Sequence, residues 1–186
     1  MRIQQIQVFK FEELKKDIQE KVIDNLREIN VDYDFCFDYL LEDFKKQLNK
    51  FGLDCDSFEY DLYRNEFNFY KLSIDDREKV INQFLTKEDK ILNLLSNNDV
   101  YFDIGFSDNS ISVNYETEEE KTEEEYKAIQ EKAEEIEEEI NEFLLNKRNE
   151  FLKILKKEYS SLLEDEAIKD TIEANEYEFK ENGEQI

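Results

Sequence analysis

The segment LDCDSFEYD, residues 53–61, holds the side chains with the clearest potential for chemistry, four carboxylates within eight residues. They are Asp54, Asp56, Glu59 and Asp61. Carboxylates at such spacing can transfer protons or hold a metal ion. The segment fails the calcium-loop pattern, because Phe58 stands at a ligand position and the required glycine is absent. Since these acids alternate with apolar residues, we expect the solvent-facing side of a strand and no metal site.

Composition excludes most other catalytic sites. The chain has no histidine, which removes Ser–His–Asp and Cys–His triads and histidine ligands for metals. It has three glycines and no glycine-rich loop that could hold a phosphate. Cys36 and Cys55 fit neither a CxxC pair nor a zinc pattern, so a reducing cytosol is the simplest environment. We therefore expect a protein that is not an enzyme and that carries no cofactor.

The net charge is the most unusual chemical property of the chain. Its 49 acidic and 25 basic residues give −24 at pH 7, which repels nucleic acids and anionic membranes and attracts basic partners. The sequence contains no run of 18 apolar residues that could span a membrane. The N-terminal MRIQQIQVFKF also lacks the apolar region of a signal peptide. We expect a cytoplasmic protein that contacts neither nucleic acid nor membrane directly.

Much of the negative charge lies between Thr117 and Glu142, which include thirteen glutamates and three lysines. On a helix, residues three and four apart are neighbours, and DNA phosphates follow each strand at about 3.4 Å along the axis. A rod of carboxylates can therefore occupy a channel lined by lysine and arginine. We expect a partner to be bound by Glu118, Glu119, Glu120, Glu123, Glu124, Glu125, Glu131, Glu134, Glu135, Glu137, Glu138 and Glu139. The alternative is a solvated helix face, the usual role of a charged run.

A basic segment follows at residues 146–157, with a net charge of +4. Its basic residues share no single helical face, and apolar residues lie between them; they are Lys147, Arg148, Lys153, Lys156 and Lys157. This arrangement argues against nucleic-acid binding. We expect the segment to complement the acidic half, either by folding back or by antiparallel pairing with a second copy, which leaves a homodimer through the long helix open.

The elements that position these residues follow from apolar periodicity. Spacing of three and four predicts helices over 12–30 and 33–52, the second ending at Gly52. Two shorter helices are predicted over 73–85 and 86–95, because each opens with a Ser or Thr three residues before an Asp.

Two hairpins follow from a change of period to two. Apolar residues alternate through 58–69 around a connection at 64–66, and through 100–115 around a turn at Asp108–Asn109. Helical spacing then returns between about residues 118 and 163, and a helix of about 40 residues there would be roughly 60 Å long at 1.5 Å per residue. Such a helix must project, bend back where Lys147 and Arg148 interrupt its apolar stripe, or pair with another helix.

The expected fold class is α+β. We expect a small antiparallel sheet of four to five strands, in two hairpins covered by amphipathic helices, with a long acidic C-terminal helix. The predicted division is a core at 1–116, the acidic-then-basic helix at 117–163, and a last helix with a short strand at 164–186 that packs back on the core. These parts form one domain overall, as the length of the chain favours.

The segments at residues 8–35 and 164–183 resemble the opening and closing segments of a widespread family of uncharacterised bacteriophage proteins. VFKFEELKKDIQEKVIDNLREINVDYDF, residues 8–35, carries the family's F-x-E-L and R-[DE]-I-N-V-D motifs. EDEAIKDTIEANEYEFKENG, residues 164–183, is similar to its closing DEAI-x-x-TIEAN-x-[YW]-EF. Together they cover roughly a quarter of the chain, in the family's order. The middle departs from the family, because FEYDLYRNEFNFY stands where relatives have a glycine-rich segment with tryptophan.

The resemblance implies a phage origin and an α+β fold, and it supplies no catalytic residue. Some members carry antitoxin-like labels, and small acidic phage proteins often inhibit host defence nucleases. With the charge, this leads us to expect an anti-CRISPR or other anti-defence inhibitor, a DNA mimic that binds a Cas effector or another basic nuclease in the host bacterial cytoplasm. The alternatives are an antitoxin-like neutraliser of a basic toxin and a self-associating coiled-coil structural protein.

Overall fold

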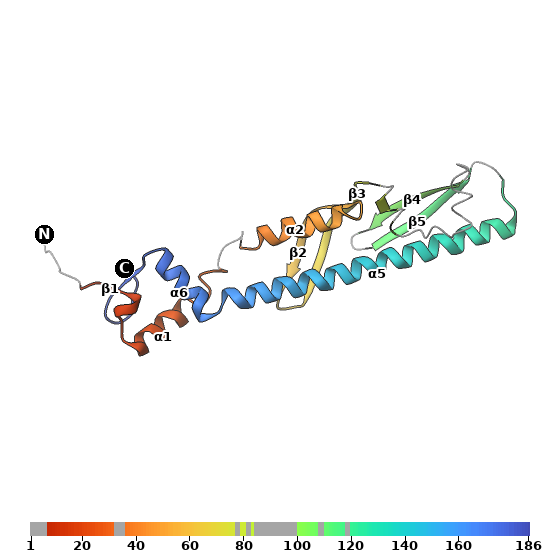
Figure 1. Cartoon of the computed structure of the whole chain (residues 1–186). Helices are drawn as coiled ribbons and strands as arrows, with labels where there is room; N and C mark the ends of the chain where they lie inside the picture. Colours follow the sequence, from red (N-terminus) through yellow and green to blue (C-terminus); the bar gives the residue numbers. More distant parts are fainter. Residues whose placement is uncertain are drawn as a thin grey trace. The chain divides into compact units, whose positions relative to one another are not determined.

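The computed structural model of the chain describes residues 7–31, 36–76, 79–80, 83, 100–107, 110–117 and 120–186 (Figure 1). Within these ranges the chain is an α+β protein, as the sequence predicts. The helices are the 3-10 turn η1 (Phe11–Glu13), α1 (Lys16–Asn25), α2 (Asp38–Asn49), α5 (Glu123–Leu162) and α6 (Asp165–Ala174). The strands are β1 (Phe9–Lys10), β2 (Leu53–Asp61), β3 (Glu66–Ile74), β4 (Val100–Ser107), β5 (Ser110–Thr117) and β6 (Glu178–Phe179).

The described strands form three separate two-stranded ladders, β1–β6, β2–β3 and β4–β5, all antiparallel. Both predicted hairpins are thereby confirmed, but they do not join into one sheet of four to five strands. Each hairpin contacts α5 instead. Phe69 of β3 packs edge-on against Phe151 with ring centroids 6.4 Å apart, and the backbone N–H of Val113 in β5 donates to the Glu137 carboxylate at 3.0 Å. Since α5 contacts both hairpins, the burial of Phe69 and Val113 requires no shared ladder.

The chain divides into two compact units, residues 1–38 with 155–186, and residues 39–154. These divisions differ from the sequence-based boundaries after residues 116 and 163. The two ends of the chain belong to one unit because β1 pairs with β6, with Phe9 opposite Phe179. The final segment thus packs on the first segment of the chain.

The unit formed by the chain ends has its own core, contributed by η1, α1, α6 and β6. Its buried members are Phe11, Leu14, Val22, Ile23, Ile168, Ile172 and Phe179. Ile18, Leu26 and Ile29 pack against this cluster together with Leu14 and Val22, and these five residues have the spacing of three and four that predicts a helix over 12–30. The helix itself is shorter than predicted, because residues 11–13 form the 3-10 turn and Leu14 is extended.

The two motifs that carry the family resemblance meet in this unit. Asn30 is buried, and its side-chain amide donates to the carbonyl oxygen of Leu162 at 3.0 Å and accepts from the hydroxyl of Thr171 at 2.6 Å. Arg27 donates to the carbonyl oxygen of Leu163 at 3.0 Å and also pairs with Asp165. The first motif is thus bonded to Asp165 and Thr171 of the second motif and to the two carbonyl groups just before it, and the buried amide of Asn30 is satisfied, as buried polar atoms require.

The helices predicted between 33 and 95 are matched only in part. α2 begins at Asp38, residues 32–35 lie outside the described part, and Gly52 follows the helix with φ +79°, which confirms the predicted stop. Ser73 lies in β3 and does not start a helix. Asp76 takes that role, because its carboxylate accepts the N–H of Lys79 at 3.1 Å in an N-cap arrangement. The helix predicted over 86–95 lies outside the described residues.

The first hairpin differs from the prediction at its tip. Leu62 was expected in a strand and Glu66 in the connection, whereas Glu66 pairs with Asp61 in the ladder and residues 62–65 form the connection. The Asp61 carboxylate closes this turn by accepting the N–H groups of Tyr63 and Arg64 at 2.9 Å each. An aspartate that bonds the backbone two and three residues ahead is a strong turn former, and it ends the strand one residue earlier than the apolar alternation indicates.

α5 is continuous over 40 residues and does not break at Lys147 and Arg148. Its fully or nearly fully buried residues repeat at helical spacing and are Ile129, Ala133, Ile136, Ile140, Leu144, Phe151 and Leu155. Elements of the unit at residues 39–154, which we call the central unit, cover this stripe. Phe44 of α2 stacks on Phe151 with ring centroids 4.1 Å apart, and beside the stripe the ring of Phe51 contacts that of Phe143 at 4.6 Å. Tertiary packing of the stripe therefore stabilises a helix that its acidic half alone would not sustain.

Candidate functional site

The start of α5 is held by a capping box. Thr122 precedes the helix, and its backbone N–H donates to the Glu125 carboxylate at 2.8 Å, while the N–H of Glu125 donates to the Thr122 hydroxyl at 3.3 Å. The Glu125 carboxylate also accepts from the Thr122 hydroxyl at 2.8 Å, and the two bonds that this carboxylate accepts from Thr122 lower its pKa, because they favour its charged form. The T-E-E-E sequence carries this signal, which sequence analysis did not single out. Glu125 therefore has a structural role besides its exposure to solvent.

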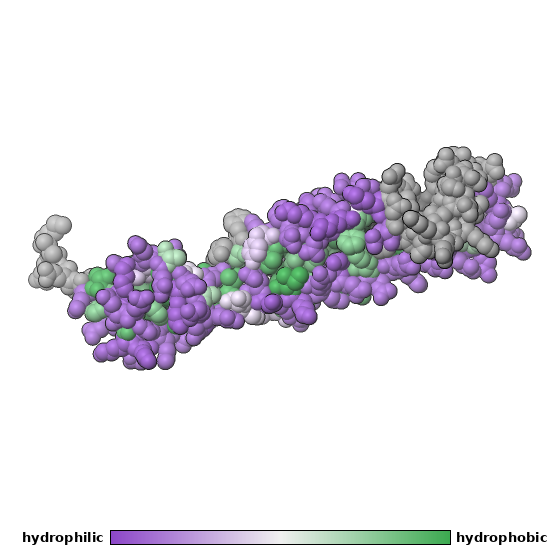
Figure 2. All heavy atoms as spheres, viewed as in Figure 1, coloured by the Kyte–Doolittle hydropathy of each residue, from purple (hydrophilic) through white to green (hydrophobic). Residues whose placement is uncertain are grey.

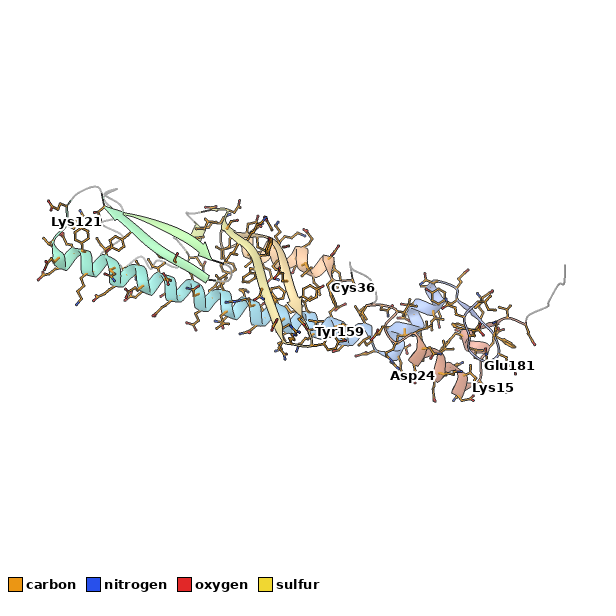
Figure 3. The ribbon with its side chains drawn as sticks, turned by 180° about the vertical axis from the view of Figure 1, so that it is seen from behind. Lys15, Asp24, Cys36, Lys121, Tyr159 and Glu181 are labelled. Carbon is orange, nitrogen blue, oxygen red and sulfur yellow. The ribbon has the colours of Figure 1, made fainter. Side chains whose placement is uncertain are left out.

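Opposite the buried stripe, α5 presents a band of carboxylates, which we call the acidic face. Its members are exposed and are Glu123, Glu124, Glu131, Glu134, Glu135, Glu138, Glu139 and Glu142. Figure 2 shows hydrophilic residues along α5, and Figure 3 shows side chains projecting on the side turned away from the β4–β5 hairpin, beginning near Lys121. Glu142 was missing from the predicted set, although it continues the same helical spacing.

The predicted set and the acidic face differ at several positions. Glu118 and Glu119 lie outside the described residues, and Glu120 is exposed but precedes the helix. Glu137 is half-buried, because its carboxylate accepts the N–H of Val113 at 3.0 Å and so ties α5 to β5. Glu137 consequently satisfies a backbone donor of the hairpin.

Neighbouring lysines neutralise little of the acidic face. Lys127 lies 3.6 Å from Glu131 and Lys132 lies 3.0 Å from Glu135, in pairs whose carboxylates are more than 60% exposed. Exposed pairs of this kind contribute only about 0–1 kcal/mol. Within the described part of the chain, the other acidic-face carboxylates form no ion pair, and Glu134 accepts a hydrogen bond from Gln130 at 3.0 Å.

The spacing of these charges resembles that of one nucleic-acid strand. Glu142 lies nineteen residues after Glu123, a distance of about 28 Å along the helix axis at 1.5 Å per residue. Eight carboxylates over that length give one per roughly 3.5–4 Å, against about 3.4 Å for the phosphates of one DNA strand. A lysine- and arginine-lined groove that accepts one strand can therefore meet a similar linear charge density on α5.

The basic segment is largely directed into the fold at its start. The ammonium of Lys147 lies 5.9, 6.0 and 5.8 Å from the ring centroids of Phe51, Phe143 and Phe151. Among the described residues, the buried Nε atom of Arg148 has no hydrogen-bond partner, and burial lowers the pKa of this guanidinium. Lys153 and Lys157 are exposed and Lys156 is half-buried. Antiparallel pairing with a second copy stays a prediction.

The four carboxylates of residues 53–61 do not form a cluster. Asp54 lies 3.6 Å from the ammonium of Lys45, Asp56 lies 3.0 Å from that of Lys71, and Asp61 serves the hairpin turn. In the part of the chain that the structure describes, no three His, Cys, Asp or Glu side chains converge to hold a metal ion. Cys55, between them, is buried, and desolvation raises the pKa of its thiol to about 12.

None of the described helices combines the length and the apolar character that crossing a membrane requires. Comparison of the chain with known protein families, with curated proteins and with solved structures finds no match. The likeness of the two chain ends to a phage family stays a prediction. A functional proposal must therefore rest on the charge and geometry of α5.

Proposed function

We propose that this chain is an inhibitor that binds a basic, nucleic-acid-acting protein through the acidic face of α5. Its carboxylates would take the positions that phosphates occupy in the groove of that protein. The observation that carries the proposal is the acidic face itself, eight exposed carboxylates on one side of an unbroken helix. The resemblance of the chain ends adds the biological setting that we propose, a phage inhibitor of a bacterial defence nuclease, with CRISPR–Cas effectors the leading class.

The packing of α5 supports this role because it holds the charges in place before binding. Ile129, Ile140 and Leu144 are fully buried beneath the band, and Glu137 fixes the helix to β5. A binding surface that is already ordered loses less conformational entropy on association than a flexible acidic tail does. The face can therefore compete with nucleic acid, whose own backbone must be ordered in the groove.

Like-charge repulsion along the helix is the second support. Glu134 and Glu138, and Glu135 and Glu139, stand four residues apart, and such pairs destabilise a helix by about 0.2–0.5 kcal/mol each. Nearby lysines offset only part of this. A basic groove would remove the repulsion and release bound counterions, so binding would be strong at low salt and would weaken steeply as salt is added.

The test uses two variants with equal net charge. In the first, the acidic-face residues Glu134, Glu135, Glu138 and Glu139 are changed to Lys. In the control, four exposed acids of the other unit that make no ion pair in the described structure are changed to Lys: Glu20, Glu28, Asp170 and Glu181. Four reversals of two charge units each move both variants from −24 to −16.

Wild-type protein is first used to capture partners from a bacterial lysate at about 50 and 200 mM salt, the range over which nucleic-acid contacts lose most of their affinity. Affinity for the captured protein, and displacement of labelled DNA from it, are then measured for both variants. We expect the acidic-face variant to lose binding by at least a hundredfold and the control to keep it, with similar melting temperatures. Equal loss in both variants would reduce the effect to net charge and refute the proposed face. Capture of a small basic toxin that binds no nucleic acid would instead favour the antitoxin-like alternative.

A further inference from the structure

A half-open cavity of about 200 Å³ lies at the surface of the unit formed by the chain ends, between η1 and the C-terminal end of α6. Phe11, Ile172 and Tyr177 supply its apolar wall. Phe11 and Ile172 belong to the core of the unit, and Tyr177 packs against it. The wall is thus part of a packed scaffold, and the cavity does not depend on the acidic face of α5.

Three exposed carboxylates stand around this wall, those of Glu12, Glu173 and Glu176. Within the described structure none of them forms an ion pair or accepts a hydrogen bond. Lys10 also lines the cavity, but its ammonium is already held by the carbonyl oxygen of Glu176 at 3.2 Å and by the Glu178 carboxylate at 3.7 Å. The rim therefore keeps an excess of negative charge beside an apolar wall.

The backbone places Glu176 firmly at this rim. It stands just after α6 with φ +53°, and its N–H donates to the carbonyl of Glu173 while that of Tyr177 donates to Ile172, both at 3.0 Å. These bonds form a Schellman motif, in which the left-handed position usually holds glycine. Here the position carries a carboxylate instead, with its main chain fixed by two hydrogen bonds.

The size and chemistry of the cavity together specify what it can take. Sites for nucleotides or other drug-sized ligands measure about 300–1,000 Å³, so this one suits a single side chain. Arginine combines an apolar stem with a planar cation that can bond two carboxylates and lie on an aromatic ring. We infer that the cavity receives an arginine side chain of a basic partner protein. This inference goes beyond the proposed function, because it uses a different unit of the chain and does not require nucleic-acid mimicry.

The experiment titrates the full-length, isotope-labelled chain with acetylated and amidated Gly-Arg-Gly, and separately with the corresponding citrulline and lysine peptides. Backbone amide shifts are followed by NMR. We expect saturable shifts at residues 172–177 with the arginine peptide, at least fivefold weaker binding of the lysine peptide, and none of the neutral citrulline peptide. A double variant, Glu173→Gln with Glu176→Gln, should weaken the arginine peptide at least tenfold.

Glu20→Gln with Glu181→Gln is the matched control, since it removes two exposed carboxylates of the same unit away from the cavity. It should bind the arginine peptide as wild type does. Shifts spread over the whole acidic surface, equal binding of the citrulline peptide, or equal weakening in both double variants would overturn the inference. Each of these outcomes leaves the test of the acidic face unaffected, because that test changes residues of α5.

Discussion

Two adjacent basic residues of α5 should respond in opposite directions to the same substitution. Lys147 is 18% exposed, and its ammonium makes an ion pair of 2.7 Å with Glu150 besides lying over three phenylalanine rings. Arg148 has a buried Nε atom for which the described part of the chain supplies no acceptor. Methionine keeps much of the apolar stem of either residue and removes its charge. We therefore expect Lys147→Met to destabilise the fold and Arg148→Met to stabilise it.

The magnitudes follow from these contacts. The Lys147 ammonium contacts three rings, each close to the ~6 Å limit for a cation–π interaction, and it also forms the ion pair with Glu150. Losing both kinds of contact should make Lys147→Met cost about 1–2 kcal/mol of stability. A buried donor without a partner costs about 1–3 kcal/mol, and because Arg148 is only half-buried we place its removal at about 1 kcal/mol of gain. Each variant changes the net charge to −25 from −24, so the general effect of charge cancels in the comparison.

Urea unfolding at pH 7, followed by the helical circular dichroism signal, measures the difference. The free energies of unfolding of the two variants should differ by about 2–3 kcal/mol. For a typical dependence of this free energy on urea concentration, their unfolding midpoints should differ by roughly 1 M urea. If the two units unfold in separate steps, the variants are compared by the midpoint of the step in which the helical signal of α5 is lost. Equal destabilisation in both variants would refute the reasoning. It would mean that the Arg148 guanidinium contributes as much to stability as the Lys147 ammonium that lies over three phenylalanine rings.

Two further changes test other parts of the fold. Gly52→Ala should destabilise the central unit by about 3 kcal/mol or more in the same unfolding assay, since the residue has φ +79° and a Cβ would lie 2.3 Å from the Asp76 carbonyl oxygen; an unchanged midpoint would contradict this. Because the Cys55 pKa is raised to about 12, the folded state holds its proton where the unfolded thiol loses it, so stability should fall as pH rises from about 9 toward 12. A Cys55→Ala variant should lack that component of the pH dependence, and a thiol reagent at pH 8 should modify Cys55 only after unfolding.

The candidate site could be predicted in outline because its signals are local. Helical spacing of Ile129, Ile136 and Ile140 defines the buried side of α5, and the glutamates between them must then face solvent. Glu137 could not be assigned in this way. It lies at the border of the buried stripe, and whether it faces a partner or β5 depends on where the hairpin docks.

The sequence by itself determined the net charge, the buried faces of α1 and α5, the helix stop at Gly52 and the existence of two hairpins. Each of these depends on residues within a few positions of one another, so propensity and periodicity are sufficient. Only the tertiary structure decided that the described hairpins stay separate ladders, that Lys147 has partners while the buried Nε atom of Arg148 finds none among the described residues, and that Phe11 and Tyr177 share a cavity. Those outcomes require segments far apart in the chain to meet, and the free energy of such contacts depends on shape, burial and loop closure, which no local pattern encodes.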